Sequence, residues 1–88
     1  MSKVFTAEQV NNDISCEIKY YMELWKKGMY ARSLDLKSTA SHAVASLLIL
    51  KEHMGLITHE ELEEAIEDFN RFKETVIYEF ITEVADNG

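Results

Sequence analysis

The sequence predicts an all-α fold, with residues 1–88 forming one small domain. Apolar residues recur every three or four positions along most of the chain, which is the period of an α-helix, and no stretch alternates as a β-strand does. The chain contains no proline, and stretches with turn and capping residues at 33–38 and 54–58 divide the pattern into three parts. We therefore expect an up-down-up antiparallel bundle of three helices. They cover about residues 7–32, 36–54 and 59–84.

The first helix is expected to begin at a capping box. Thr6 and Gln9 have the spacing in which the hydroxyl accepts from the third helical amide and the glutamine side chain reaches back. Gly28 lies inside the apolar pattern that follows, and it costs about 1 kcal/mol relative to alanine. The helix therefore either ends or loosens at Gly28, or continues to about Arg32.

The second helix is expected to begin near Leu36 or Thr39 and to end at Met54. Its middle, residues 43–50, is apolar on nearly every side. A helix that is hydrophobic all round is a buried helix. We therefore expect it to be the central helix of the bundle.

The start of the third helix carries the clearest local signals. Gly55 suits the left-handed position that follows a helix, and Thr58 with Glu61 forms a second capping box. The apolar positions of this helix cover roughly half of its circumference. We expect the helix to end near Val84, with residues 85–88 frayed.

The apolar stripes are wider than a three-helix monomer requires. An outer helix of such a monomer needs a stripe of about 100°, whereas the first and third helices each carry one of roughly 180°. One short bundle cannot cover these faces, so we expect the surplus to be buried in a homodimer, helix-swapped arrangements included. The alternative is a monomer in which helix curvature and the polar ends of Tyr and Trp leave a tolerable apolar surface.

Composition and charge exclude several classes of protein. A chain that is 47% hydrophobic is not a disordered tail, and a net charge of −7 opposes nucleic-acid binding by bulk charge, so we expect no nucleic-acid partner. No apolar run reaches the roughly 18 residues of a membrane span, and residues 1–8 lack the apolar core of a signal peptide. The one cysteine, Cys16, cannot form an internal disulfide, which fits a cytoplasmic location.

No motif for catalysis, phosphate binding or metal binding occurs in the sequence. His42, His53 and His59 lack the glutamate three residues earlier that a di-metal helical site requires. His53 and His59 flank the Gly55 turn, where they can at most hold a metal adventitiously. We interpret Cys16 as an inert thiol, because Lys19 is its one cationic neighbour at helical spacing. The sequence predicts no enzymatic activity, no metal and no cofactor.

Two groups of residues are candidates for contact with a partner. Tyr20 and Tyr30 lie at or beyond the edge of the first apolar stripe, and tyrosine is enriched at interfaces. Nearby apolar positions are instead assigned to the core: Tyr21, Met22, Trp25 and Met29. The second group has helical spacing that places several acids on one face of the third helix. It comprises Glu60, Glu64, Glu67 and Asp68.

The sequence thus predicts a small, acidic, cytoplasmic, non-enzymatic interaction module, homodimeric, that regulates or adapts another protein. The alternative is a stoichiometric inhibitor of a nucleic-acid-handling enzyme, of the immunity or phage anti-defence type, whose acidic third helix occupies a basic cleft. A helix-turn-helix interpretation fails, because the helix that would enter the DNA groove opens with a run of acids. Contact with DNA would have to use the basic residues Lys26, Lys27, Arg32 and Lys37.

Overall fold

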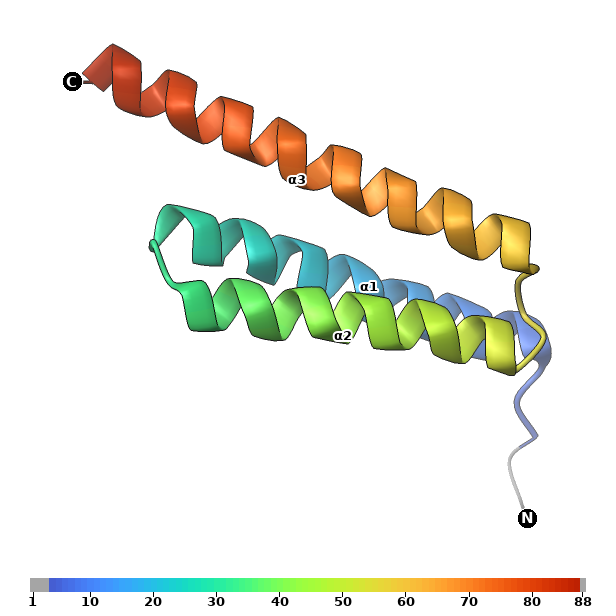
Figure 1. The fold of residues 1–88 in the computed structure, drawn as a ribbon. Coiled ribbons are helices and arrows are strands. Elements are labelled where there is room, and N and C mark those ends of the chain that lie inside the picture. The colour runs from blue at the N-terminus through green and yellow to red at the C-terminus, as the bar shows by residue number, and fades with distance from the viewer. Residues whose placement is uncertain (1–3, 88) are drawn as a thin grey trace.

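The computed structural model describes residues 4–87, and this part of the chain contains three α-helices and no strand. The helices are α1 (Ala7–Tyr30), α2 (Leu34–His53) and α3 (His59–Asn87). The chain reverses direction at each of the two connections, so that consecutive helices run back along one another (Figure 1). The all-α prediction is confirmed. The sequence expectation of no signal peptide involves residues 1–3, which lie outside the described residues.

α1 begins at the expected capping box and passes through Gly28 without a break. The Gln9 amide donates to the Thr6 hydroxyl at 3.1 Å, and the Thr6 amide donates to Gln9 Oε1 at 2.8 Å. Gly28 is buried, and a β-carbon at this position would lie 3.0 Å from both the backbone nitrogen and Cγ of Lys37. The glycine therefore marks the close approach of the start of α2 to α1, and the helix does not end there. α1 ends at Tyr30, two residues before the expected end near Arg32, because the chain turns toward α2 with a φ of 55° at Arg32.

α2 begins at Leu34, two residues before the earliest predicted start. The Ser33 hydroxyl accepts from the Leu36 amide at 3.2 Å and so caps the helix earlier than expected. The expectation that α2 is buried all round is wrong, since Ile49 is 47% and Leu50 44% exposed. The neighbouring helices cover one side of α2 only, and the opposite side is left open.

α3 starts where the sequence places it and ends later. Gly55 has a φ of 72°, and the Thr58 hydroxyl accepts from the Glu61 amide at 3.1 Å. The helix has 29 residues against 20 for α2, and its C-terminal end projects past the turn between α1 and α2 (Figure 1). The predicted end at Val84 is three residues short, because residues 85–87 continue the helix, while Gly88 lies outside the described residues.

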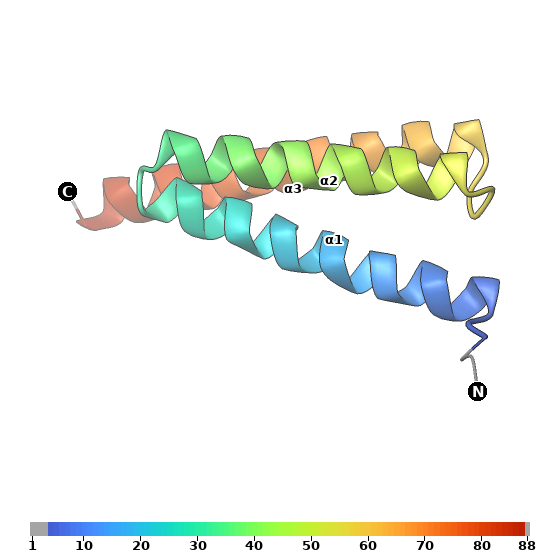
Figure 2. The ribbon, with the colours of Figure 1, turned by 90° about the horizontal axis from the view of Figure 1, so that it is seen from below.

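One hydrophobic core joins the three helices, but they share it unequally. α1 and α2 form a close hairpin, and α3 approaches each of them at far fewer places. The two helices of the hairpin lie closest near their turn and diverge toward the N-terminal end of α1 (Figure 2). The buried apolar residues of the core are Ile14, Ile18, Trp25, Ala40, Val44, Leu48, Leu62, Phe69 and Val76.

The molecule is long, thin and rich in surface. It measures 58 × 31 × 19 Å, and its radius of gyration is 15.6 Å, against about 12 Å for a compact domain of this length. Its accessible surface is 6498 Å², whereas a folded monomer of this mass exposes about 5,300 Å². Three helices therefore leave more surface in water than a chain of this size usually does.

Candidate interaction surfaces and the inter-helix cavity

An apolar stripe runs along the outer side of α3, beside the face that packs on the core. At about 100° per residue its members fall on one side of the helix, and each is exposed by more than a third. We call this surface the α3 stripe. It consists of Ile66, Ile77, Ile81 and Val84.

The four predicted acidic site residues share a different, fully solvated side of α3. Glu60, Glu64, Glu67 and Asp68 are all exposed. Asp68 pairs with Arg71 on the next turn of the helix. Among the described residues, the other three acids form no ion pair. The structure therefore brings these side chains onto one helical side, with Arg71 reducing the charge at its centre.

The two predicted tyrosines differ in their surroundings. Tyr20 is 59% exposed and meets only the ring of Tyr21 edge-on, at a centroid distance of 5.2 Å. Tyr30 instead packs edge-on against Phe80 of α3 at 5.4 Å, and the Arg32 guanidinium lies 5.9 Å from the same Phe80 ring. Tyr30 thus helps to attach α3 to the end of α1, while Tyr20 is available at the surface.

Carboxylates near Tyr30 also affect its ionisation. Partial burial of the phenol and the negative charges of Glu83 and Glu79 raise the pKa of Tyr30 above its usual value. The hydroxyl therefore remains protonated and neutral at physiological pH, as a hydrogen-bond donor next to two acids.

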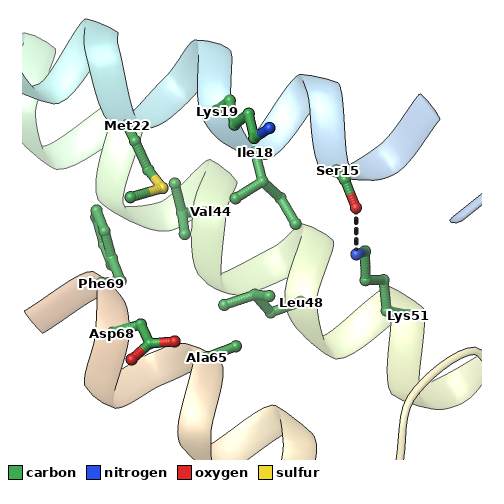
Figure 3. Close-up of a pocket in the computed structure, with 10 residues that line it drawn as sticks. All are labelled: Ser15, Ile18, Lys19, Met22, Val44, Leu48, Lys51, Ala65, Asp68 and Phe69. Atoms are coloured by element: carbon green, nitrogen blue, oxygen red, sulfur yellow. Dashed lines mark hydrogen bonds between the residues drawn. The ribbon is translucent and has the colours of Figure 1, made fainter. Parts of the chain in front are cut away.

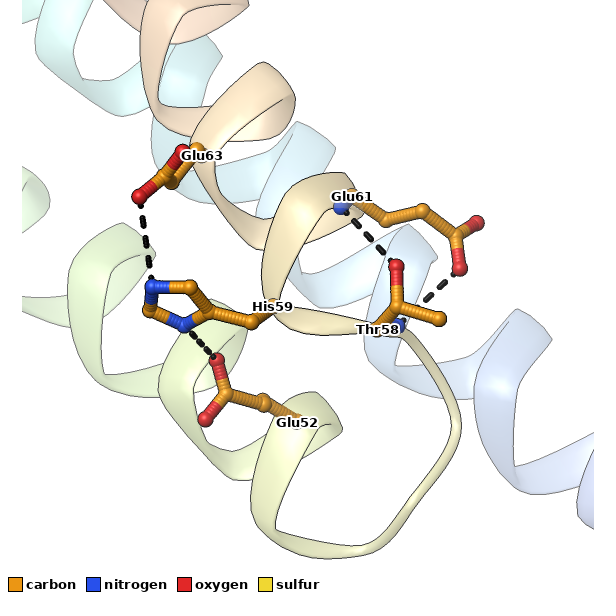
Figure 4. A network of polar contacts seen from close by, with 5 residues as sticks. All are labelled: Glu52, Thr58, His59, Glu61 and Glu63. Carbon is orange, nitrogen blue, oxygen red and sulfur yellow. Dashed lines mark hydrogen bonds and ion pairs between the residues drawn. The ribbon is translucent and has the colours of Figure 1, made fainter.

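His59 connects the end of α2 to the start of α3 (Figure 4). Its Nδ1 lies 2.9 Å from a carboxylate oxygen of Glu52, and its Nε2 lies 3.2 Å from one of Glu63. The hydrogen bond to Glu52, with the charges of Glu52 and Glu63, raises the pKa of His59 above its usual value. From the sequence, His59 was expected at most to hold a metal adventitiously with His53, and its contacts with Glu52 and Glu63 were not predicted. No group of three potential metal ligands comes together among the described residues.

A cavity of about 230 Å³ lies between the hairpin and α3 (Figure 3). Apolar side chains from all three helices form most of its wall: Ile18, Met22, Val44, Leu48, Ala65 and Phe69. Four polar side chains complete the lining: Ser15, Lys19, Lys51 and Asp68. The sequence did not predict that any of these polar residues lines a cavity. Asp68 was expected only as part of the acidic side of α3.

Lys51 is the unusual member of this lining. Its side chain belongs to the buried face of α2, with 8% of the residue exposed, and its Nζ donates to the Ser15 hydroxyl at 2.6 Å. The Ser15 hydroxyl donates in turn to the backbone carbonyl of Asn11 at 2.9 Å. The proton of the Ser15 hydroxyl is thus directed away from Lys51. In a nucleophilic serine that a lysine base activates, the hydroxyl proton is instead directed toward the lysine. A signal was present in the sequence, because Lys51 follows Val44 and Leu48 at helical spacing on the core face.

Comparison with known proteins adds no relative: no protein-family model, curated protein or solved structure matches this chain. Across residues 4–87, none of the helices has the length and apolarity needed to cross a membrane. Cys16, the predicted inert thiol, is exposed on α1 and forms no disulfide.

Proposed function

We propose that this protein is a cytoplasmic, non-enzymatic interaction module that works as a homodimer and regulates or adapts another protein. In this proposal the three helices form an up-down-up bundle that a second copy completes. The observation that carries it is the exposed apolar surface of α3, which a second copy of the chain would cover.

The excess exposed surface of the chain is large enough for an interface with a second copy. The chain exposes 6498 Å², roughly 1,200 Å² more than a compact monomer of the same mass. A standard protein interface buries about 800 Å² on each partner. The excess is large enough to include an interface of this size along one helix.

The α3 stripe is the part of this surface best suited to self-association. Ile77, Ile81 and Val84 lie on the same side of α3 in its C-terminal half, and each is exposed by more than a third. A two-fold axis places the same surface patch on both subunits, so a single apolar stripe is sufficient for a symmetric contact.

Sedimentation velocity over a wide range of protein concentrations tests the dimer. We expect a species near twice 10.2 kDa for the natural sequence. Ile81→Glu should convert it to monomer, because it places a charge in the centre of the α3 stripe. Ile49→Glu is the matched control, since Ile49 on α2 has a similar exposure of 47% against 58% for Ile81. A natural chain that stays monomeric at the highest concentration contradicts the dimer, and dissociation by Ile49→Glu alone moves the interface to α2.

Tyr20 is the candidate contact for a different protein. It is exposed outside the core, so Tyr20→Ala should weaken partner binding without loss of stability. Tyr30→Ala also removes the contact between Tyr30 and Phe80, so it would change the stability of the fold together with the affinity for a partner. Unchanged partner affinity in Tyr20→Ala would remove this residue from the interface.

The alternative function, inhibition of a nucleic-acid-handling enzyme, draws its support from the solvated acids of α3. Glu60, Glu64 and Glu67 are exposed on one helical side and carry no paired cation within residues 4–87. Such a side resembles a row of phosphates in charge and can enter a basic cleft.

A charge-reversal experiment separates this alternative from the regulatory dimer. Glu60→Lys, Glu64→Lys and Glu67→Lys together should abolish stoichiometric inhibition of a susceptible purified nuclease or helicase, while the dimer persists. Glu8→Lys, Glu17→Lys and Glu23→Lys on α1 change the net charge equally at exposed positions and serve as the control. If the natural protein inhibits none of a panel of such enzymes, or the α3 variant inhibits as well as the natural protein, the alternative is wrong.

A further inference from the structure

We propose that the cavity between the hairpin and α3 binds a small monocarboxylate with an apolar body, whose carboxylate group is held by the ammonium groups of Lys51 and Lys19. This site is separate from the α3 stripe and shares only Asp68 with the acidic side of α3. The proposal goes beyond the dimeric interaction module.

The cavity has the two kinds of wall that such a ligand needs. Its apolar part comes from all three helices, with Ile18 on α1, Leu48 on α2 and Phe69 on α3 (Figure 3). Its polar end is formed by Lys51 and the Ser15 hydroxyl, and Lys19 on α1 adds a second ammonium group to the lining (Figure 3). Sites for small molecules combine mainly apolar walls with a few convergent polar groups in this way.

The charge on Lys51 points to an anionic ligand. The residue is nine-tenths buried, and the one hydrogen bond of its ammonium group within the described residues goes to a neutral hydroxyl. No carboxylate of the described residues pairs with Lys51. A buried charge without a counter-charge is unfavourable, and a bound carboxylate would supply both the opposite charge and acceptors for the remaining donors.

The other charged groups at the cavity leave this preference intact. Lys19 adds a second positive charge, and Asp68 is the one acid in the lining. Asp68 is already paired with Arg71 on the surface side of α3. The lining thus contains two cationic side chains and one acidic side chain, and that acid is already paired with Arg71. This balance of charge favours an anionic ligand over a cationic one.

The volume limits the size of the ligand. An apolar cavity of about 150 Å³ in another protein accommodates benzene, which has six non-hydrogen atoms. In proportion, about 230 Å³ accommodates a molecule of roughly nine such atoms. Benzoate has this size and combines an aromatic ring with one carboxylate, so it is a suitable probe.

Titration of the isotope-labelled protein with benzoate, followed by NMR, tests the site. We expect saturable shifts at Ile18, Leu48 and Phe69, which line the cavity and do not belong to the α3 stripe. Benzyl alcohol and benzylamine are the matched neutral and cationic probes. Each should bind at least about tenfold more weakly than benzoate, because benzyl alcohol lacks the negative charge that pairs with the ammonium groups and benzylamine is repelled by them.

Lys51→Met keeps a long, unbranched side chain and removes the charge, so it should reduce benzoate affinity about tenfold or more. The preference for benzoate over benzyl alcohol should decrease but not vanish, because Lys19 remains. Lys27→Met, at an exposed position of α1 outside the cavity, should leave benzoate affinity unchanged. Absence of saturable benzoate shifts, equal or tighter binding of benzylamine, or full benzoate affinity in Lys51→Met would each overturn the proposal. The order of the three probes on the natural protein decides the question even if Lys51→Met does not fold. Sedimentation of the natural protein is independent of this order, so failure of the dimer is distinguished from failure of this site.

Discussion

The α1–α2 hairpin and α3 differ in the size of the side chains at their contacts. Where α1 meets the start of α2, Gly28 is buried against Lys37, and Ala40 is fully buried in the same core. α3 contributes Phe69 and Phe80 to its contacts with the hairpin. Because the distance between packed helices is set by the side chains at the contact, small residues bring α1 and α2 together and large rings keep α3 farther away.

This difference explains both features that we associate with function. A third helix held away by aromatic rings leaves a cavity beneath it, which Phe69 lines. A helix nine residues longer than α2 also carries exposed apolar side chains in its C-terminal half, Ile81 among them. The hairpin contains the closest contact between helices, and α3 carries the apolar stripe and one wall of the cavity.

The largest expected contrast comes from one substitution made in both regions. Val44→Ala should lower the free energy of unfolding by about 2 kcal/mol, because Val44 is 0% exposed and the shortened side chain leaves a void. Val84→Ala on α3 should change it by no more than about 0.5 kcal/mol, since Val84 is 46% exposed. Urea unfolding of both variants, under conditions in which the chain is monomeric, measures the difference. Equal losses would contradict the division into a tightly packed hairpin and a loosely packed third helix.

Gly28→Ala tests the close approach within the hairpin itself. Helix propensity alone favours alanine by about 1 kcal/mol, but overpacking against the Lys37 backbone costs about 1–3 kcal/mol. We expect a net loss of about 1 kcal/mol in unfolding free energy. The matched control is Ala45→Gly at an exposed position of α2, which should lose about 1 kcal/mol from propensity only. If Gly28→Ala raises the free energy of unfolding by as much as Ala45→Gly lowers it, packing does not require a glycine at position 28.

The sequence determines the local features of the fold well, because these depend on neighbouring residues. Both capping boxes and the left-handed Gly55 occur as predicted, since each is decided by side chains within one or two turns. Three helices form as expected, but their ends differ from the predicted ends by one to three residues. Tyr21, Met22 and Met29 pack against the core and Trp25 is buried within it, as the stripe of α1 predicted.

What the sequence did not reveal depends on how the helices are placed in space. The apolar run of α2 suggested a helix buried all round, yet Ile49 and Leu50 remain exposed, because hydrophobicity does not say how many neighbours a helix has. The pairing of Lys51 with Ser15 joins residues 36 positions apart and follows from the register between α1 and α2. The spacing of Lys51 from Leu48 could have predicted that this lysine faces the core. It could not have predicted that Ser15 is its hydrogen-bond partner.

A comparable effect is expected where α3 is attached to the hairpin. Thr58→Ala removes the hydroxyl that accepts from the Glu61 amide, and loss of such a cap costs about 1 kcal/mol. Thr6→Ala removes the equivalent group at the start of α1. There the first turn is exposed and can unwind without disturbing the core, so we expect a smaller loss. Urea unfolding measures both, and a greater loss for Thr6→Ala would mean that the end of α1 is held more firmly than the start of α3.

The weakest expected effect concerns the pH dependence of the contact between α2 and α3 at His59. Since the pKa of His59 is raised in the folded chain, the contact contributes to stability fully below the unfolded pKa of about 6.5. The contribution is lost as the pH rises through the higher folded pKa, and His59→Gln should remove this part of the pH dependence. Glu52→Gln should lower the pKa of His59 more than Glu63→Gln does, because the hydrogen bond to Glu52 is the largest cause of the shift. NMR titration of the imidazole ring measures both pKa values, and a larger decrease in Glu63→Gln would show that the contact within α3, rather than the one to the hairpin, controls this histidine.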